Sequence, residues 1–575
     1  MPRNGNGKTF NTQQSLNNAV WDICNILRRS NCASALQYIP ELTWILFLRI
    51  LDEQETTEAA EAGALGMAFT PSLESPYRWQ DWAAPGGWKR VELEKGALGS
   101  FFGFINTDLI PALQKLKDAP NASPRQKVIS QILSGVERTR IDTEKNLYDV
   151  LDRVHAISMA NMDPTHIFAL SQVYEGLLLK MGEKANDGGQ FFTPRIVIRV
   201  MVRVVNPQIG KPIYDPTAGT GGFHAESYEY MRAQAGDRIT AEQLETLKQR
   251  TFYGREKDNL IYPITLANLV LHGIDRPNIW HGNTLTGQEI YGGLFQDAPI
   301  LYPIVLTNPP FGGKEGKEAQ TNFAYKTGAT QVLILQHVIN SLEPGGACGI
   351  VLDEGLLFRT NETAFVQTKR KLLDDCNLWC IVSLPGGVFT AAGAGVKTNL
   401  LFFTKGQRTE KIWYYDLSDI KVGKKTPLTL DHFEEFFRLL PSRGDSAHSW
   451  TVDIIARRQA AKRQADPLRA QAAKPAGQAE RIRGEIKELK KAALVDRPRI
   501  DALEREAGQL DAEARELMSK AQAIQDAVYD LKAVNPNAKA DEDVRTPEEL
   551  VARIREKGRE AEAALAELEQ TPSHC

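Results

Sequence analysis

Apolar positions follow helical spacing in the first part of the chain. They recur every three or four residues on one face of an expected helix: Leu16, Val20, Ile23 and Leu27. Pro40 then stands at the expected start of a second helix with a heavily apolar face. This pattern predicts a helical N-terminal domain over residues 1–170.

The spacing changes between residues 171 and 410, where short apolar runs alternate with helical segments. The expected strands are PIYDP, TFYG, NIWHG, IVLTN, GIVLD, WCIVSLP and NLLFFTK. Alternation of this kind predicts an α/β fold, with a mostly parallel sheet and helices on both of its faces. Ligands of such sheets bind at the carboxyl ends of the strands, so the candidate site residues are the polar residues at those ends.

A sustained 3-4 spacing appears in residues 456–531, after a connecting segment over residues 411–455. Its members are Ile482, Ile486, Leu489, Ala493, Ile500, Leu503, Ala507, Leu510, Ala514, Leu517, Ala521, Ile524, Val528 and Leu531. A solvated charged helix is the simpler alternative. The sustained heptad seam favours a helical hairpin or a coiled coil that binds a partner, with Pro498 near the start of the second helix.

The tail, residues 532–575, predicts one more helix. Thr546 as the N-cap, Pro547 at the first helical position and Glu549 at the third form a capping box. We expect this helix to dock on a partner.

Composition narrows the class of protein without identifying a chemistry. The chain has 42% hydrophobic residues, 25% charged residues and a net charge of −3, whereas a solitary DNA-binding protein usually carries a basic excess. No apolar run approaches the ~18–20 residues of a membrane span, and the start lacks the apolar core of a signal peptide. The six cysteines form no CxxC pair, so neither a metal site nor a disulfide is expected. We therefore expect a cytoplasmic protein.

Residues 213–223, IYDPTAGTGGF, have the order of a strand, an acidic residue, a Gly-rich turn and a helix. Gly219, Gly221 and Gly222 allow the backbone to approach a ligand closely. Turns of this kind bind dinucleotides and other adenosine ligands. No Lys-Ser or Lys-Thr pair follows, which excludes a P-loop. Asp215 would repel a pyrophosphate but suits a ligand with an ammonium group, such as S-adenosylmethionine.

The next two expected strands also end in polar residues. Glu256 follows the second strand, where an acidic side chain accepts hydrogen bonds from ribose hydroxyls. Asn283 follows the third strand, where we expect it to contact the adenine of the same ligand. For either residue alone, an exposed polar side chain is the simpler interpretation. Three successive strand ends with polar residues favour a binding edge.

The fourth strand ends in TNPPF, residues 307–311. Asn-Pro-Pro alone is equally consistent with a rigid turn. Beside a cofactor cleft, however, Asn308 Oδ1 and the Pro309 carbonyl oxygen can each accept one N–H of a planar amino group. Its nitrogen is then drawn toward tetrahedral geometry, with the lone pair aimed at a sulfonium methyl group. Phe311 is placed to stack on the substrate, and the prolines hold the carbonyl rigidly.

Together, DPTAGTGGF and NPPF resemble the amino-methyltransferases, specifically the N6-adenine DNA methyltransferases. GEKANDGGQFFTPRIVI narrows the resemblance to the methylation subunits of type I restriction–modification systems, as do LANLVLHGI, SLPGGVFTAAGAGVKTNLLFFTKG and the tail YDLKAVNPN. The motifs occur in the family's order over most of the chain. The resemblance implies a Rossmann-like, S-adenosylmethionine-dependent methyltransferase domain between the helical N-terminal domain and a helical C-terminal region.

The resemblance also implies roles for individual residues. The methionine end of the cofactor would be lined by Gln190, Phe191, Phe192, Thr193, Pro194 and Arg195. The cofactor loop would be formed by Thr220, Gly221 and Gly222, and the ribose would be bound by Glu256. The catalytic clamp would consist of Asn308, Pro309, Pro310 and Phe311.

The chain departs from the family pattern in three places. Asn283 stands where related adenine methyltransferases often carry Asp, which puts its contact in doubt. VLDEG replaces a Pro-containing version and leaves Asp353 and Glu354 without an assigned role. The span from about Ala456 to Ile524 looks inserted relative to the family's compact tail.

The implied activity is site-specific methylation of adenine N6 in duplex DNA. The implied partners are double-stranded DNA, a specificity subunit shared by two methylation subunits, and a restriction and translocation subunit. Protein-glutamine and RNA amino-methyltransferases share the Asn-Pro-Pro-aromatic clamp and are the enzymatic alternative. A subunit that only binds DNA or partners is the non-enzymatic alternative. The chain has no Pro-Cys pair, which excludes cytosine-C5 methylation.

Overall fold

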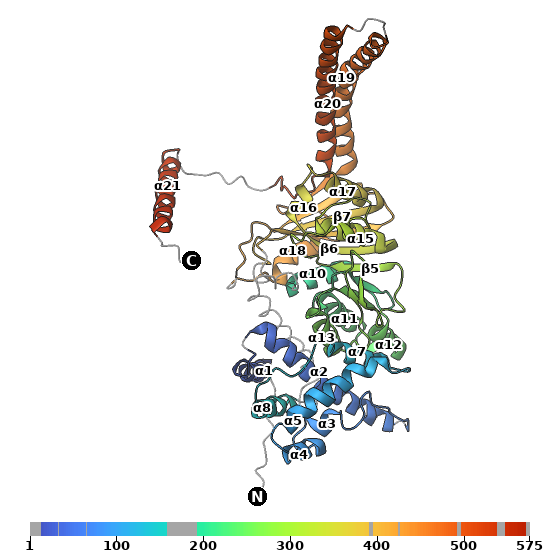
Figure 1. The fold of residues 1–575 in the computed structure, drawn as a ribbon, viewed down its shortest axis with the longest axis vertical. Helices are drawn as coiled ribbons and strands as arrows, with labels where there is room; N and C mark the ends of the chain where they lie inside the picture. Colours follow the sequence, from blue (N-terminus) through green and yellow to red (C-terminus); the bar gives the residue numbers. More distant parts are fainter. Residues whose placement is uncertain are drawn as a thin grey trace.

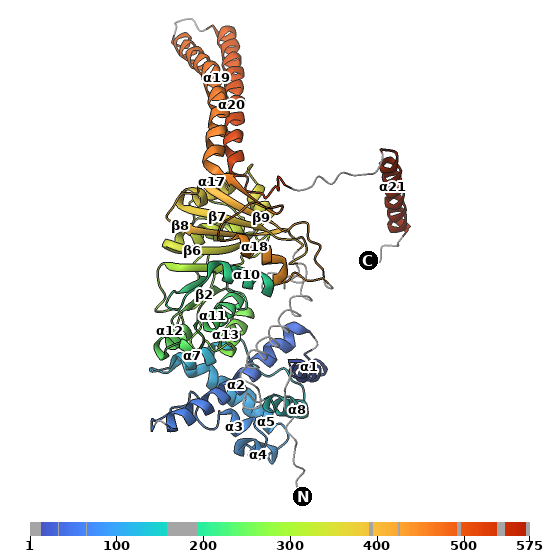
Figure 2. The ribbon, with the colours of Figure 1, turned by 180° about the vertical axis from the view of Figure 1, so that it is seen from behind.

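The computed structural model describes residues 13–32, 34–64, 66–157, 193–389, 395–423, 426–491, 496–537 and 547–570. Three parts follow one another along the long axis of the molecule (Figures 1 and 2). Helices from the start of the chain lie at one end, a ten-stranded sheet with its helices lies in the middle, and a long pair of helices projects at the other end.

The N-terminal region is helical, as the apolar spacing predicts. Its elements are α1 (Gln13–Arg29), α2 (Ala35–Ala64), α3 (Trp79–Trp82), α4 (Trp88–Glu94), α5 (Ser100–Gly103), the π-helix η1 (Phe104–Leu109), α6 (Ile110–Gln114), the 3-10 helix η2 (Lys115–Asp118), α7 (Pro124–Ile132) and α8 (Glu144–His155). Residues 41–51 of α2 are buried on every side, which explains why this stretch shows no polar face. One hydrophobic core joins these helices to the sheet region.

The sheet has the strand order β10-β9-β7-β8-β6-β5-β1-β2-β3-β4. Its strands are β1 (Ile213–Asp215), β2 (Phe252–Glu256), β3 (Asn278–Gly282), β4 (Glu289–Tyr291), β5 (Tyr302–Thr307), β6 (Leu342–Asp353), β7 (Cys376–Ser383), β8 (Thr398–Lys405), β9 (Lys411–Asp416) and β10 (Ser449–Asp453). The run β3-β2-β1-β5-β6 is parallel throughout. All seven strands expected from the sequence are present.

Helices cover both faces of the sheet. One face carries α10 (Arg195–Val205), α11 (Gly222–Ala235), α12 (Ala241–Gln249), α13 (Ile261–Leu271) and α18 (Glu434–Leu439). The other carries α15 (Thr330–Ser341), α16 (Glu354–Phe358) and α17 (Thr363–Asp375). Short elements are η6 (Gly236–Arg238), α14 (Lys317–Gln320) and η8 (Leu430–Phe433).

The sheet is less parallel than the alternation of strands and helices predicts. β8 pairs antiparallel with both β6 and β7, and β4 and β10 are antiparallel to their neighbours. A parallel return requires a crossover connection, usually a helix. Residues 384–397, which join β7 to β8, include no described helix, so β8 turns back beside β7.

Residues 411–455, expected as a connecting segment, contribute two strands to the same sheet. β9 pairs parallel with β7, and β10 pairs antiparallel with β9. The side chains of Trp413, Tyr414 and Tyr415 are all buried, so β9 has apolar contacts on both faces. A strand buried on both faces lacks the alternation that marks a half-exposed strand, which explains why the pattern missed it.

The expected helical hairpin is present as α19 (Ile454–Leu489) and α20 (Arg497–Asp526), with Pro498 in the first turn of α20. The buried positions of α20 fall every seven residues, at Ile500, Ala507, Ala514 and Ala521. The small side chains of the three alanines let the two helices pack closely. Ion pairs between Lys490 and Glu504 (2.8 Å) and between Arg499 and Glu485 (2.8 Å) also join the helices.

The seam ends before the expected Val528 and Leu531. α20 stops at Asp526 and is followed by the 3-10 helix η9 (Ala527–Tyr529). Val528 and Leu531 are buried in the core of the sheet region, where the Leu531 amide donates to the Leu357 carbonyl oxygen (3.1 Å). These two apolar residues therefore anchor the base of the hairpin. α21 (Pro547–Gln570) starts where the capping motif predicts, although Thr546 and Ala493 lie outside the described residues.

In the described part of the chain, no helix combines the length and apolar character that crossing a membrane requires.

Candidate functional site

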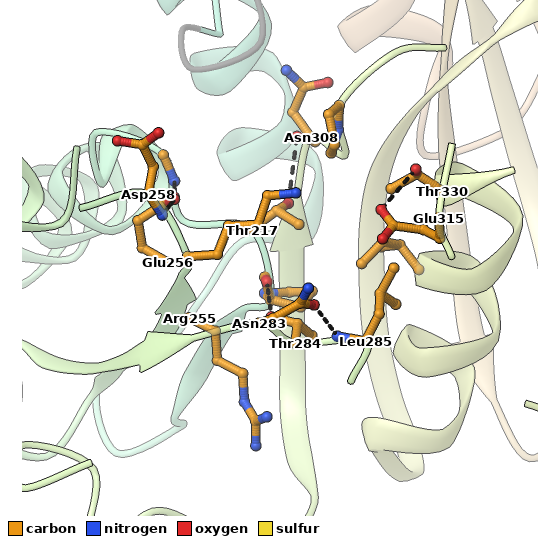
Figure 3. Close-up of a pocket in the computed structure, with 15 residues that line it drawn as sticks. Thr217, Arg255, Glu256, Asp258, Asn283, Thr284, Leu285, Asn308, Glu315 and Thr330 are labelled. Atoms are coloured by element: carbon orange, nitrogen blue, oxygen red, sulfur yellow. Dashed lines mark hydrogen bonds between the residues drawn. The ribbon is translucent and has the colours of Figure 1, made fainter. Parts of the chain in front are cut away.

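A cleft lies at the carboxyl ends of β1, β2, β3 and β5 (Figure 3). It holds about 680 Å³ of empty space, including the part open to solvent. A smaller pocket of about 320 Å³ adjoins it. Both pockets are lined by Thr217, Gly219 and Asn308, so they form one continuous site.

The Gly-rich turn forms one wall of this site. Gly219 and Gly221 have φ angles of 52° and 80°, in the left-handed region that favours glycine. A Cβ on Gly221 would lie 2.9 Å from Leu269 Cδ2, and one on Gly222 would lie 2.7 Å from Ile198 Cδ1. The glycines at these positions therefore allow the turn to pack against α10 and α13.

Two side chains of α13 hold the turn from behind. Thr265 Oγ1 donates to the Gly219 carbonyl oxygen, and Asn268 Nδ2 donates to the Thr220 carbonyl oxygen (2.8 Å). These bonds turn both carbonyls toward the helix. The sequence pattern did not indicate either residue: Asn268 lies within the motif LANLVLHGI and Thr265 directly precedes it, but neither polar position was given a partner.

Asp215 lies at the tip of β1 and is 1% exposed. Its Oδ1 accepts hydrogen bonds from Thr307 Oγ1 (2.6 Å) and from the Thr217 amide (3.0 Å). Burial raises the pKa of the Asp215 carboxyl to about 7, although these two bonds lower it. The carboxyl lines the smaller pocket, so a cationic group bound there would favour its charged form.

Glu256 lies at the end of β2 and lines the main cleft, as Figure 3 shows. Its Oε2 accepts a hydrogen bond from the Gly219 amide (2.9 Å), and its Oε1 accepts one from the Asp258 amide (2.8 Å). Burial raises the pKa of this carboxyl to about 7. Each carboxylate oxygen keeps a second lone pair that can accept a hydrogen bond from a hydroxyl group of a ligand.

Asn283 lines the same cleft after β3. Its Oδ1 accepts from the Leu285 amide (2.9 Å), which makes the side chain part of a turn. The Nδ2 group is the one left to face a ligand, as a donor. An Asp at this position offers acceptors only, so the Asn changes which atom of an adenine ring can be contacted.

Asn308 lies at the end of β5, and its side chain is held at one end only. Nδ2 donates to Thr193 Oγ1 (3.0 Å). Oδ1 is buried and accepts no hydrogen bond from any residue that the structure describes. A buried acceptor without a donor is costly, so Oδ1 is an atom of this site to which a ligand donor would be favourable.

The other members of the clamp follow directly. The Pro309 carbonyl oxygen accepts a long hydrogen bond from Gln331 Nε2 (3.4 Å), and Pro310 lines the main cleft. Phe311 is half-buried, and its ring meets Phe389 edge-on with a centroid distance of 5.2 Å. Phe389 was missed as a site residue, because it lies 78 positions away in sequence and only the fold brings the rings together.

A second cleft of about 960 Å³ lies beside the clamp. Gly312, Lys314 and Arg359 line it, together with Asp353. Asp353 caps α16, because its Oδ1 accepts from the Leu356 amide (2.7 Å). Glu354 pairs with Lys397 (3.0 Å) and, after the hairpin, with Lys532 (3.8 Å). The two acidic residues without an expected role therefore stabilise local structure.

The segment expected at the methionine end is only partly described. Gln190, Phe191 and Phe192 lie outside the described residues. Thr193 lines the smaller pocket and contacts Asn308, and Pro194 is the N-cap residue of α10. Arg195 pairs with Glu226 of α11 (2.7 Å) and does not line either pocket. Arg195 thus joins α10 to α11, and its expected contact with the cofactor stays a prediction.

Comparison with known families gives two matches. Residues 165–463 match the family model described as N-6 DNA Methylase, which covers more than half of the chain. Residues 16–154 match the model described as HsdM N-terminal domain.

Individual proteins agree with this result. The chain is 32% identical to the type I restriction enzyme EcoEI methylase subunit of Escherichia coli, over 77% of this chain and 89% of that protein. It is 30% identical to the EcoKI methylase subunit of Escherichia coli strain K12, over 73% and 75% of the two chains. A solved chain from a study of the assembly of the type I restriction–modification system matches with a TM-score of 0.65 and 32% identity, over 97% and 98% of the two chains.

Proposed function

This chain belongs to the N-6 DNA methylase family as a methylase subunit of a type I restriction–modification system, and we propose how its residues transfer a methyl group to adenine N6. It is an adenine-specific DNA methyltransferase. The proposed methyl donor is S-adenosylmethionine, and the proposed catalytic residue is Asn308. The observation that carries the proposal is the buried, unpaired Oδ1 of Asn308 at the edge of the cleft.

The residues of the two joined pockets fit S-adenosylmethionine. Asp215 supplies a buried carboxyl for the ammonium group, and Glu256 supplies carboxylate oxygens for the ribose hydroxyls. Leu285 and Pro310 line the main cleft and offer apolar surface to the adenine ring, while Asn283 offers its Nδ2. When bound, this cofactor supplies an electrophilic methyl group.

Asn308 acts on the target amino group. Adenine N6 is a poor nucleophile, because its lone pair is delocalised into the ring. When Asn308 Oδ1 and the Pro309 carbonyl oxygen each accept one N–H, the nitrogen becomes more tetrahedral and its lone pair is oriented for attack. The Pro309 carbonyl has a lone pair for this contact, since Gln331 occupies only one. Such positioning contributes several of the ~7–11 kcal/mol available to well-oriented reactants.

Phe311 acts on the base as a whole. Adenine N6 in a duplex is reached by flipping the nucleotide out of the stack, at a cost of a few kcal/mol. The half-buried ring of Phe311, held edge-on by Phe389, offers a face on which the flipped adenine stacks. Stacking on an aromatic side chain contributes about 1–3 kcal/mol per base, which offsets part of the cost of flipping.

The chain works with partners in this proposal. Its net charge of −3 provides little of the phosphate attraction that dominates DNA affinity. We assign most of the basic surface and all base reading to a specificity subunit, with two methylase subunits for each specificity subunit and a separate restriction and translocation subunit. The hairpin and α21 are the proposed docking elements. The comparisons give no support for a protein-glutamine or RNA methyltransferase.

Reconstitution tests the proposal. The chain is combined with its specificity subunit and given S-adenosylmethionine that carries a tritiated methyl group. We expect incorporation into a duplex that contains the recognition site, and none into RNA or protein. Isothermal titration of the isolated chain should show cofactor binding that Glu256→Ala weakens. Unchanged affinity in Glu256→Ala would remove Glu256 from the ribose site, and incorporation into RNA or protein alone would overturn the proposed substrate.

A further inference from the structure

The carboxamide of Asn308 has no rigid support of its own. An Asn side chain turns about two bonds, so a catalytic oxygen on it is well placed only if other groups hold it. The backbone carbonyl oxygen of Asn308 lies 3.4 Å from Thr217 Oγ1, a long and weak contact. The side chain has one hydrogen-bond partner among the described residues, which is Thr193 Oγ1 at 3.0 Å.

Thr193 is itself held in place by the start of α10. Pro194, the next residue, has its φ angle fixed by its ring, and Arg195 pairs with Glu226 of α11 at 2.7 Å. Ile198, one turn further along α10, lies against the Gly-rich turn at Gly222. Thr193 therefore presents its hydroxyl from the segment just before α10, a helix that is packed on the cofactor turn.

We propose that Thr193 is a positioning residue that holds the Asn308 carboxamide so that Oδ1 projects into the space for the target amino group. This inference rests on the proposed function of Asn308. The resemblance to known methylases implies a cofactor contact for Thr193, whereas the hydrogen bond assigns it a role that acts through Asn308.

The hydrogen-bond chemistry of Nδ2 and Oδ1 explains why the Asn308 carboxamide has this orientation. A hydroxyl both accepts and donates, so Thr193 can hold either end of the carboxamide. The target amino group carries two N–H donors and requires an acceptor. It therefore selects the orientation in which Nδ2 faces Thr193 and Oδ1 faces the cavity. Without the Thr193 hydroxyl, both the position and the orientation of the carboxamide become free to vary.

Two substitutions at Thr193 isolate the hydroxyl. Thr193→Val keeps the branched shape and removes the hydrogen bond, whereas Thr193→Ser keeps the hydroxyl. A misplacement of about 1 Å in a catalytic group costs about 100-fold in rate, so we expect Thr193→Val to lower kcat about 10- to 100-fold. Thr193→Ser should stay within about threefold of the wild type. The affinity for S-adenosylmethionine, measured by isothermal titration, should change less than about threefold in both variants.

A double-mutant cycle distinguishes positioning from a general structural effect. The single-turnover rate of the reconstituted complex is measured for Thr193→Val, Asn308→Ala and the double variant. If Thr193 acts through Asn308, the double variant should be no slower than Asn308→Ala. Thr57→Val, an exposed threonine on α2, is the control and should keep the wild-type rate.

Each alternative result has a defined meaning. Additive losses in the double variant, or a Thr193→Val enzyme with the wild-type kcat, would overturn the positioning role. A large loss of cofactor affinity with unchanged kcat would also overturn it, in favour of a direct cofactor contact. A wild-type complex that methylates no adenine would overturn the proposed function of Asn308 itself.

Discussion

The two halves of the ten-stranded sheet use polar residues at their strand ends in different ways. In the parallel half, Asp215 and Glu256 end β1 and β2, Asn308 follows β5, and all three line the joined pockets. In the mixed half, which begins at β6, Asp353 and Asp453 end β6 and β10 and cap the helices α16 and α19.

Strand direction explains the difference. Parallel neighbours bring several carboxyl ends to one edge, and their helical crossovers leave that edge open. β8 runs the other way, so the segment between β7 and β8 and the start of α16 lie at this edge of the mixed half, whereas β10 ends at the opposite edge, beside the start of β9. The polar residues that line the joined pockets thus come from strands whose neighbours are parallel. The mixed half instead carries the base of the hairpin.

Removing Asn308 Oδ1, the hydrogen-bond acceptor at the edge of the parallel half, should have the largest effect on kcat. Asn308→Ala should lower kcat about 100- to 1000-fold, as loss of one transition-state contact does, with cofactor affinity near the wild-type value. Asp416→Ala is the matched control, because it removes a strand-end carboxyl from the mixed half. Its kcat should stay within about twofold in the same tritium assay. Similar losses in both variants would remove the distinction between the two edges.

Changing the stacking face should have a smaller effect. Phe311→Ala should lower kcat/KM about 10- to 100-fold, because the flipped base loses its aromatic partner. Phe311→Trp should retain most of the activity, since an aromatic face remains. Steady-state kinetics on the reconstituted complex measures both variants. Equal activity of Phe311→Ala and Phe311→Trp would show that Phe311 only fills space beside Phe389.

The buried carboxyl of Asp215 should make the stability of the cofactor-free chain depend on pH. The folded pKa of about 7 lies above the ordinary value of 3.8, so the folded state binds the proton more tightly. This contribution is complete below pH ~4 and is lost as pH rises through ~7, at most about 4 kcal/mol in all.

Asp215→Asn keeps the shape and removes the titration. The difference in Tm between wild type and Asp215→Asn, measured by calorimetry from pH 5 to pH 8, should therefore shift by several degrees in favour of the variant as pH rises. A difference that is independent of pH would mean that Asp215 is charged throughout this range.

Shortening the hairpin should have the smallest effect on the cofactor site. Replacing residues 462–520 with a short loop leaves Leu531 and the base of the hairpin in place. Cofactor affinity should stay within about twofold of the wild type, whereas assembly with the specificity subunit, followed by size-exclusion chromatography with light scattering, should weaken. A large loss of cofactor affinity would contradict the separation of the two halves.

Local sequence predicted the strand ends of the parallel half well, because each motif carries its own turn chemistry. The Gly-rich turn and the Asn-Pro-Pro clamp meet in one site, and the heptad seam forms the hairpin. Features that depend on contacts between residues far apart in sequence could not be predicted from local motifs. The reversal of β8, the pairing of Arg195 with Glu226, and the contact between Phe311 and Phe389 each join residues far apart in sequence.

The chemical identity of the product tests the central claim most directly. After reaction of the reconstituted complex with a duplex that contains its site, the DNA is digested to nucleosides and analysed by mass spectrometry. N6-methyldeoxyadenosine should be the only new nucleoside, and Asn308→Ala should produce almost none. Formation of N4-methyldeoxycytidine, or wild-type amounts of N6-methyldeoxyadenosine from Asn308→Ala, would contradict an adenine methyltransferase that acts through Asn308.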